Sequence, residues 1–288
     1  MVTGVGARGG IARRALSVST LKHEIEYNLT NQAASEGNPR WLFHAHQKEK
    51  YSMIPYHFEI KSGARGTASE FTNYITRVGS HSDREDLVAT EHGNMPEWAE
   101  DDPRLFFRAS DKFERKNGSA FRTMTFNLPK NLTEEQNKIL ARDITHQLVG
   151  DKPFLLAVHA PVSSLAGEIH PHGHVMVSDR IPDGIQRSPE QTFKRFNRAH
   201  PERGGREKGS GGKNRMELRE WVVTQRKIVA DLTNAALARH GHWERVDHRT
   251  LRDQGVRRKP ERYLGPARIR TMTAAEKTQY VRVRHSER

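Results

Sequence analysis

The sequence predicts an α+β fold, in which flanking helices cover a central, largely antiparallel sheet. The first observation is a set of short segments that are continuously apolar or alternate apolar and polar residues, as strands do. The second is a set of longer segments whose apolar residues recur at helical spacing. The third is that two strand segments follow each other with only a loop between them, which favours an antiparallel pair. The expected order is strand, helix, helix, strand, helix, strand, strand, helix.

The composition indicates polar chain ends and a polyanionic partner. Only 34% of the 288 residues are hydrophobic, which is low for a chain that is packed throughout, so sizeable polar tails are expected. The formal net charge of +13 favours nucleic acid over a membrane surface, because no long basic amphipathic helix stands out. The alternative is that basic tails serve only solubility.

The absence of cysteine excludes several kinds of chemistry. A disulfide, a thiolate zinc site and a thiol nucleophile are all impossible, and the composition fits a reducing, cytoplasmic environment. No apolar run approaches the roughly 18 residues that span a bilayer, and the first residues lack the apolar core of a secretory signal. We therefore expect no insertion into a membrane.

Three regions are expected along the chain. Residues 1–52 predict a poorly ordered N-terminal extension, because they carry scattered charge and no sustained period. Residues 53–266 hold the strands, helices and motifs of a folded domain. Residues 267–288 predict a polar C-terminal tail that frays. Met53 precedes the first strand segment, so it is a candidate for the natural start of the protein.

The first strand and helix stand close together. Residues 56–61 alternate and predict a strand, and residues 62–66 predict a turn. A helix follows with Thr67 or Ser69 as its N-cap. Tyr74 falls at helical spacing among apolar residues of this helix, so periodicity alone predicts that it belongs to the core.

The middle of the chain predicts two more helices with a strand between them. A helix is expected around residues 97–117 and a strand over residues 121–128. Thr133 and Gln136 have the spacing of a capping box, which predicts the start of the next helix. Gly150 is expected to end that helix.

A loop-rich stretch covers residues 181–212. Within it Phe193 is followed by Lys194 and Arg195, a pattern typical of base stacking combined with neutralisation of a nucleic-acid backbone. An ordinary exposed loop is the alternative. The Gly-rich segment at the end of this stretch predicts a flexible basic linker. A long helix is expected to follow over residues 216–240.

Three histidines predict a metal site. His172 and His174 are two apart on an apolar strand, so their side chains point to the same face. His159 ends the preceding strand, and an antiparallel pairing brings it across from them. Three neutral imidazoles form a site with open positions for a substrate oxygen. The alternative is chance proximity among 16 histidines, and His170 is read as a loop residue that could substitute as a ligand.

Five segments occur in a fixed order between residues 53 and 266. They are YHFEIKSGARG followed by NYITR, HGNMPEW, FRTMTFNLP, HA…HPHGHVMVSDRI, and DHRTLRDQG…YLGP. Their sequences and their order resemble the MobA/MobL group of plasmid mobilisation relaxases. The histidine block and the DHR…LGP block are the most specific, and residues 53–266 then correspond to the relaxase domain.

The resemblance implies a metal-dependent, strand-specific nicking endonuclease of the HUH type, with a ferredoxin-like or palm-like antiparallel sheet. In such enzymes a tyrosine attacks one phosphodiester at a plasmid transfer origin and forms a reversible 5′-phosphotyrosyl intermediate during conjugative mobilisation. The implied nucleophile is Tyr74, and Tyr56 is next in line. The implied metal ligands are His159, His172 and His174. The implied cofactor is Mg²⁺ or Mn²⁺, with another transition ion also compatible with imidazole ligands.

The implied partners are single-stranded or melted DNA at a transfer origin, accessory mobilisation proteins and a coupling or secretion system, in the bacterial cytoplasm. Arg180 matches the basic residue that closes the family's histidine motif. A basic groove with aromatic side chains suits a single strand. The candidate DNA-binding residues are Lys61, Arg65, Arg77, Arg180, Lys194 and Arg195.

Two positions depart from the family pattern. Gly173 stands between the last two histidines, where the motif implies a hydrophobic residue. Thr123 and Thr125 occupy positions where some members carry glutamates, which leaves the general base unassigned. Two other functions therefore stay open: a rolling-circle replication initiator, which shares the tyrosine and histidine chemistry, and a non-catalytic DNA-binding protein with the same fold.

Overall fold

A computed structural model describes residues 51–99, 102–258, 260 and 264–286. The expected N-terminal extension lies outside the described residues, except for its last two positions. No helix in the described part of the chain combines the length and the apolar character that crossing a bilayer requires.

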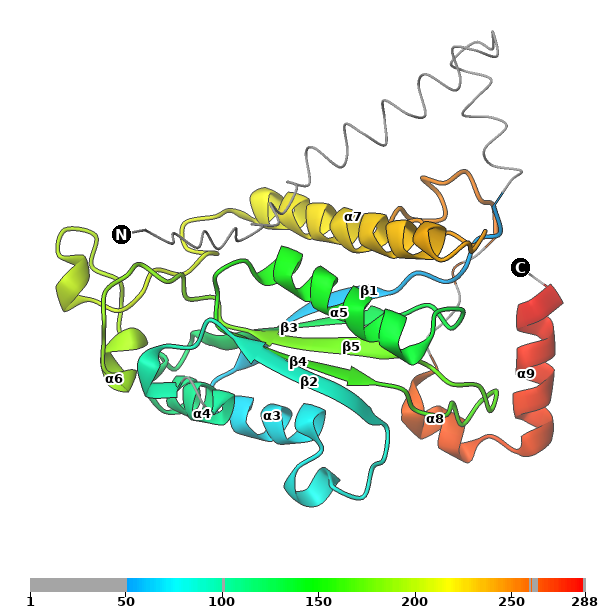
Figure 1. Ribbon diagram of the computed structural model, residues 1–288, viewed down its shortest axis with the longest axis horizontal. Helices are drawn as coiled ribbons and strands as arrows, with labels where there is room; N and C mark the ends of the chain where they lie inside the picture. Colours follow the sequence, from blue (N-terminus) through cyan, green and yellow to red (C-terminus); the bar gives the residue numbers. More distant parts are fainter. Residues whose placement is uncertain (1–50, 100–101, 259, 261–263, 287–288) are drawn as a thin grey trace, which may run out of the picture. The chain divides into compact units, whose positions relative to one another are not determined.

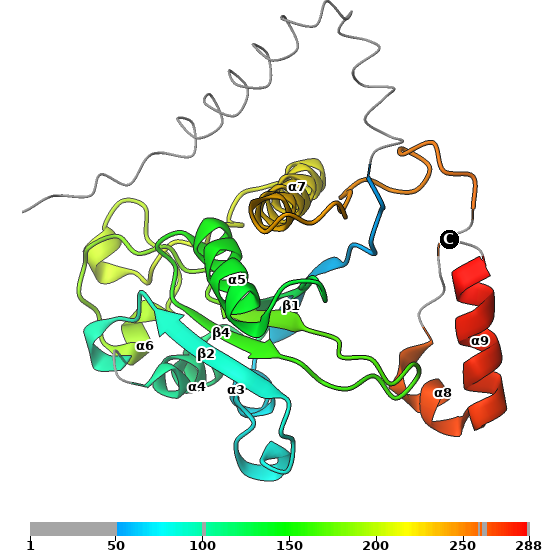
Figure 2. The same ribbon diagram turned by 45° about the vertical axis from the view of Figure 1, so that its right-hand side comes forward.

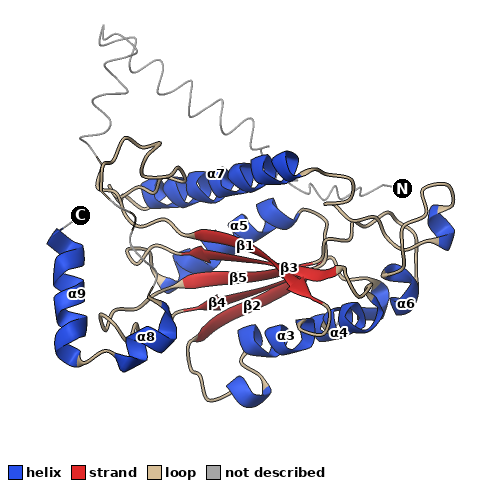
Figure 3. Ribbon diagram, turned by 180° about the vertical axis from the view of Figure 1, so that it is seen from behind, coloured by secondary structure: helices blue, strands red, loops and turns tan. Residues whose placement is uncertain are grey.

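The described chain forms one five-stranded sheet in which every neighbouring pair of strands is antiparallel. The order is β1-β3-β5-β4-β2, so β1 and β2 are the edge strands (Figure 3). The predicted α+β class with an antiparallel sheet is confirmed. The strands are β1 (Phe58–Ala64), β2 (Leu87–Gly93), β3 (Ser119–Asn127), β4 (Phe154–His159) and β5 (His172–Val177).

Helices cover both faces of the sheet, with α5 and α7 on one face and α3 and α4 on the other (Figures 1 and 2). The helices are α3 (Ala68–Thr76), α4 (Pro103–Phe113), α5 (Glu134–Val149), α6 (Pro189–Thr192), α7 (Arg215–Arg239), α8 (Gly265–Thr271) and α9 (Ala274–Ser286). Short 3-10 turns occupy η1 (Gly79–His81), η2 (Glu97–Ala99) and η3 (Pro201–Arg203).

Strand alternation creates two separate cores. On one face Met124, Phe126 and Leu156 pack against α5 and α7. On the other face Leu155 and Met176 pack against α3 and α4. Every residue of β4 is buried, because this central strand is covered on both faces.

The start of a helix agrees with the sequence prediction where the capping side chain belongs to the first turn of that helix. The capping box of Thr133 and Gln136 starts α5, and Gly150 ends it, as predicted. Thr67, one of the two predicted N-cap residues, occupies the N-cap position of α3, but its side chain makes no capping bond. Asp111 of α4 instead accepts hydrogen bonds from the backbone N–H groups of Gly66, Ala68 and Ser69 at 2.8–2.9 Å. The side chain that accepts these hydrogen bonds belongs to another helix, so the sequence around the start of α3 does not indicate it.

Three sequence predictions of local structure are corrected. Strand β2 was not predicted, because it is an edge strand whose residues are only half-buried or exposed and show no clear alternation. The helix expected over residues 97–117 is shorter and runs only over Pro103–Phe113. Residues 267–288 were expected to form a frayed tail, but α9 and most of α8 occupy this segment.

Gly173 of β5 lies beneath the ring of Phe126, its cross-strand partner on β3. A Cβ atom at this position would come within 2.4 Å of the ring, and Phe126 is fully buried. The aromatic ring therefore fills the space in which the family motif implies a hydrophobic residue. This packing accounts for glycine between the two histidines.

We expect Gly173→Ala to lower the free energy of unfolding by about 1–3 kcal/mol, because the added methyl group overpacks the core. Phe126→Leu should remove the clash, so the double variant should lose less than the sum of the two single losses. Urea unfolding of the four proteins measures the coupling. Additive losses would contradict this packing account.

Candidate functional site

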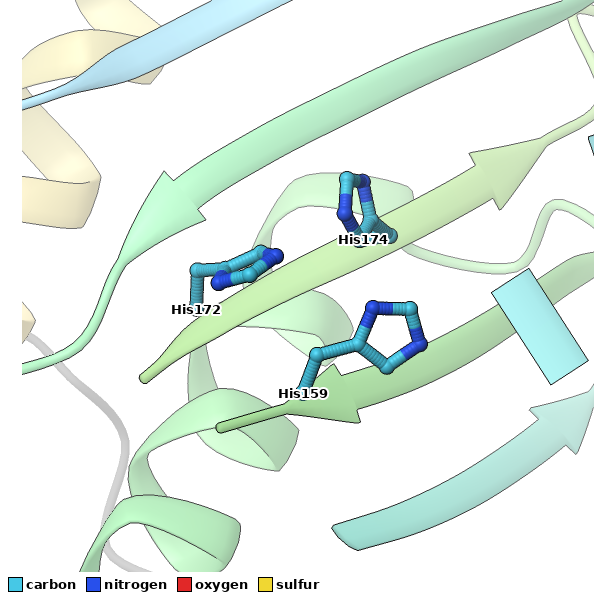
Figure 4. A group of neighbouring side chains, drawn as sticks. All are labelled: His159, His172 and His174. Carbon is cyan, nitrogen blue, oxygen red and sulfur yellow. The ribbon is translucent and has the colours of Figure 1, made fainter. Parts of the chain in front are cut away.

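A β-hairpin brings three histidines together. His159 at the end of β4 pairs directly with His172 at the start of β5, as predicted, and His174 lies two residues further on (Figure 4). Their side chains share the face covered by α3 and α4. The ring centroids of the three pairs are 4.9–5.5 Å apart. One ring nitrogen from each histidine lies within 4.8 Å of the others, so the three could hold a metal ion.

Hydrogen bonds fix one nitrogen of each ring away from the centre. Nε2 of His159 donates to the carbonyl of Ile75 at 2.7 Å, and Nδ1 of His172 donates to the carbonyl of His170 at 2.8 Å. A carbonyl only accepts, so each remaining nitrogen carries a lone pair. Nδ1 of His174 lies 3.2 Å from Oγ1 of Thr125. Nε2 of His174 is buried without a hydrogen-bond partner among the described residues.

Burial keeps the three imidazoles neutral. It lowers the pKa of His159 to about 4 and that of His174 to about 3, and it also lowers the pKa of His172. Neutral imidazoles at pH 7 present lone pairs without a proton to displace. The orphaned Nε2 of His174 and the three-nitrogen donor set therefore fit a divalent transition ion.

Tyr74 lies beside the histidines on α3. Its ring is half-buried, with its centroid 6.2 Å from that of His174 and 5.4 Å from that of His81. The guanidinium groups of Arg77 and Arg84 lie over the ring, at 4.8 and 5.6 Å from its centroid. Periodicity alone predicted a core residue, and the structure places Tyr74 at the margin between the core and the site.

Arg77 connects the helix of Tyr74 to the histidines. It ends α3 in the left-handed conformation (φ 56°, ψ 45°), which is unfavourable for a residue with a side chain. Its Nε and Nη2 donate to the carboxylate of Asp86 at 2.7 and 2.8 Å, and its Nη1 donates to the carbonyl of Tyr74 at 2.6 Å. Nη2 also donates to Nδ1 of His159 at 3.1 Å.

Asp86 is a site residue that sequence reasoning missed. Burial works against its charge, but the hydrogen bonds and charge of Arg77 hold the pKa of this carboxyl below its usual range. It follows η1 in a polar stretch, and no local pattern distinguishes it from its acidic neighbours. Only the fold reveals that it pairs with Arg77.

The other candidate DNA-binding residues fall into different places. Lys61 lies on the same sheet face as the histidines and pairs with Glu59 at 2.8 Å. Arg65 is exposed and donates to two backbone carbonyls at the end of α4. Lys194 and Arg195 are exposed beside α6, at the end of β5 opposite to His172 (Figure 1).

The prediction that Arg180 contacts DNA is wrong. Its guanidinium is buried and forms an ion pair with Glu114 at 2.8 Å, and Glu114 is itself only 1% exposed. It also donates to the backbone carbonyls of Phe193, Lys194 and Arg206 at 2.6–2.9 Å. Arg180 therefore fixes the loop after β5 to the sheet, and no donor is directed to solvent.

The base-stacking interpretation of Phe193 is corrected by the same cluster. Phe193 is fully buried and packs against Phe106 of α4, with ring centroids 5.3 Å apart. The expected flexible linker is also anchored at its start, because residues 204–206 are buried. An aromatic residue in a basic loop here belongs to the core.

Tyr56 lies away from the histidines and packs against the core on the α5 and α7 face. Its hydroxyl donates to the carbonyl of Arg226 on α7 at 2.6 Å. Burial raises the pKa of its phenol, which disfavours the phenolate. Tyr74 is therefore the better placed of the two tyrosines named from the sequence.

A profile of the MobA/MobL family matches residues 67–274, which is most of the chain. The chain belongs to the MobA/MobL family. The match begins just before α3 and ends at the start of α9, so it covers Tyr74, Arg77 and the three histidines of this MobA/MobL protein. The resemblance stated from the five segments is confirmed.

Curated relatives of this MobA/MobL protein are known from three bacteria. It is 40% identical to a "43 kDa relaxation protein" of Salmonella typhimurium over 209 residues, which is 72% of this chain and 56% of that protein. It is 40% identical to "Mobilization protein A" of Escherichia coli over 220 residues, 74% of this chain and 30% of that protein. It is 31% identical to "Mobilization protein MobL" of Acidithiobacillus ferridurans over 178 residues, 53% and 43% of the two chains. The chain thus spans about half or less of each relative.

Two solved structures are similar at low identity. One is described as the molecular basis of vancomycin resistance transfer in Staphylococcus aureus, with 19% identity and a TM-score of 0.49 over 69% of this chain and 100% of that chain. The other is the MobM relaxase domain bound to oriT DNA, with 14% identity and a TM-score of 0.37 over 78% of this chain and 100% of that chain.

We expect Arg180→Met to lower the free energy of unfolding by about 3–5 kcal/mol, because it leaves the Glu114 carboxylate buried beside fewer donors. Lys138→Met removes the surface ion pairs of Lys138 with Glu134 and Glu135 on α5 and should lose much less. Urea unfolding compares the two variants. Equal losses would mean that the buried pair contributes no more than a surface pair.

Proposed function

We propose that this chain is a DNA relaxase that nicks one strand at a plasmid transfer origin through Tyr74. The observation that carries the proposal is the position of Tyr74 beside His174, on a helix joined to His159 through Arg77. Membership of the MobA/MobL family and relatives named as relaxation and mobilisation proteins support it. A phenol next to three potential metal ligands suits nucleophilic attack on a phosphodiester.

The metal ion would be held by Nδ1 of His159 and by Nε2 of His172 and His174. It would replace the hydrogen bond that Arg77 donates to Nδ1 of His159. These nitrogens carry lone pairs when the opposite ring positions donate to Ile75, His170 and Thr125. When bound, a divalent cation neutralises charge on a non-bridging phosphate oxygen. Mg²⁺, Mn²⁺ or another transition ion is compatible with the proposal.

The protein's own residues account for the bond changes. The Tyr74 phenol oxygen forms a bond to phosphorus while the bond between phosphorus and the 3′ oxygen breaks. The phenol proton leaves to water and the 3′ oxygen takes up a proton, which yields a 5′-phosphotyrosyl adduct and a free 3′-hydroxyl. The adduct is still a phosphodiester, so the reverse attack by a 3′-hydroxyl is nearly balanced in energy and recloses the strand.

No side-chain carboxylate is assigned as the general base. Thr123 and Thr125 carry none, and the carboxylate of Asp86 is occupied by Arg77. The guanidinium groups of Arg77 and Arg84 lie over the Tyr74 ring and would offset negative charge that develops on the reacting groups during the attack. Water then suffices as the proton acceptor.

The substrate of this proposal is single-stranded or melted DNA, because the phosphate must reach a ring that is half-buried between α3 and the sheet. Lys61 and Arg65 are exposed cations that could contact the DNA backbone, and Lys194 and Arg195 could do so at the other end of the sheet. Accessory mobilisation proteins, a coupling or secretion system and action in the bacterial cytoplasm belong to the same proposal.

The decisive experiment mixes the purified protein with a single-stranded oligonucleotide that carries the nick site of its cognate transfer origin, with Mn²⁺ or Mg²⁺. A denaturing gel should show a covalent protein–DNA adduct, because the phosphotyrosyl bond survives denaturation. Tyr74→Phe should abolish the adduct, since it removes only the phenol oxygen, and a chelator should also abolish it.

Other results would change the assignment. An adduct that survives Tyr74→Phe would move the nucleophile to another residue. Tight binding without any adduct would favour a non-catalytic DNA-binding protein. Cleavage of a replication origin in preference to a transfer origin would favour a rolling-circle initiator.

We expect Thr125→Val to weaken binding of Mn²⁺ by about tenfold to a hundredfold, because the Thr125 hydroxyl orients the ring of His174. The change keeps the shape of the side chain and removes its oxygen. Thr123→Val is a matched control, since Thr123 is also half-buried on the same face of β3. Calorimetric titration with Mn²⁺ measures both variants, and equal affinities would refute the role of Thr125.

A further inference from the structure

Two guanidinium groups lie over the ring of Tyr74, and they differ in their other contacts. Arg77 lies at 4.8 Å and Arg84 at 5.6 Å from the ring centroid. By position alone, either guanidinium could hold a phosphate next to the phenol. The hydrogen bonds of each arginine show which of the two has donors left for a phosphate.

Arg77 has few donors left for a substrate. Its side chain is 5% exposed, and it donates to both carboxylate oxygens of Asp86, to the Tyr74 carbonyl and to His159. A guanidinium has five N–H groups, and these contacts use four of them. A phosphate that engaged Arg77 with both arms would have to break an ion pair and release the end of α3.

Arg84 is in the opposite situation. It is exposed in the loop that follows η1, and its backbone N–H donates to the carbonyl of His81 at 3.3 Å. Across the described chain, no hydrogen bond or ion pair is formed by its guanidinium group. Its contact with the Tyr74 ring is therefore its main interaction, and its five donors remain available on the open side of the tyrosine.

The turn that carries Arg84 is fixed relative to Tyr74. His81 of η1 forms an ion-pair contact with Glu70 of α3, with Nε2 and Oε1 2.8 Å apart. The His81 ring also meets the Tyr74 ring edge-on, at an interplanar angle of 88°. These contacts hold η1 against the helix that carries the tyrosine, so Arg84 is presented to the same place as the phenol.

We propose that Arg84 binds a phosphodiester oxygen of the DNA strand that Tyr74 attacks, and that Arg77 positions the helix without contacting DNA. A guanidinium matches two phosphate oxygens with parallel N–H donors, and the pairing adds a charge-assisted hydrogen bond. The inference rests on the proposed relaxase function. It assigns substrate contact to Arg84, which no sequence motif indicated, and withdraws it from Arg77.

The test compares Arg84→Gln, Arg84→Lys and Arg108→Gln. Arg108 is a matched control, because it is an exposed arginine on α4 in the same helical layer. Each substitution is made in the full chain, both with Tyr74 present and in the Tyr74→Phe background. The probe is a fluorescent single-stranded oligonucleotide that carries the cognate nick site, and urea unfolding verifies that each variant is folded.

In the Tyr74→Phe background, equilibrium binding reports phosphate contact without any covalent step. Arg84→Gln should weaken binding by about tenfold to a hundredfold, as expected for the loss of a charged hydrogen bond. The slope of log affinity against log salt should fall by about 0.7, the value for one phosphate contact on a single strand. Arg84→Lys should retain the salt slope but bind more weakly than the parent, and Arg108→Gln should change neither quantity.

With Tyr74 present, Arg84→Gln should also slow adduct formation at saturating oligonucleotide, whereas a remote cation that only attracts DNA would not change that rate. Unchanged binding and rate in Arg84→Gln would overturn the inference, and so would an equal loss in Arg108→Gln. Failure of the proposed function is distinguishable: the wild type would form no adduct, while the binding comparison would still report on Arg84. Absence of oligonucleotide binding by the wild type would overturn both.

Discussion

The guanidinium of Arg77 holds the two halves of the site together. It joins Asp86, the end of α3 and His159, which come from three different segments of the chain. A buried charge is tolerated only when it is paired and hydrogen-bonded, and here the carboxylate of Asp86 supplies the pairing. The left-handed backbone at Arg77 costs about 1 kcal/mol or more, and these hydrogen bonds offset it. The position of Tyr74 relative to the histidines depends on this cluster.

The sheet gives the histidines a rigid base. Side chains alternate along each strand, so one face of β4 and β5 packs entirely into the core while the other presents His159, His172 and His174. Both strands lie inside the sheet, with neighbours on each side. Directly beneath the histidines, the ring of Phe126 occupies the space above Gly173. Close packing on one face therefore restricts the motion of the three histidines on the other face.

Local patterns were sufficient for the histidine hairpin and for much of the fold. The spacing of His172 and His174, the loop residues before them and the capping box at Thr133 each depend on neighbours in the sequence, and each was predicted correctly. Arg180 and Phe193 were misread as exposed, because their burial depends on Glu114 and Phe106, far away in the chain. Periodicity could not distinguish Tyr74 from a core residue, since a ring at the edge of a core has the same spacing. Only the family resemblance pointed to Tyr74 as the nucleophile that we propose.

The contacts that build the site differ greatly in sequence separation. The β4–β5 hairpin is closed by a short loop, whereas the bond between Ile75 and His159 joins residues 84 apart. Closing a longer loop loses more conformational entropy, and a helix on the outside of a sheet opens more readily than a pair of strands inside it. Local opening of α3 would thus withdraw the tyrosine and leave the histidine hairpin paired. Any chemistry that needs the phenol and the imidazoles together would therefore require the complete fold, because a partly opened chain retains the imidazoles without the phenol.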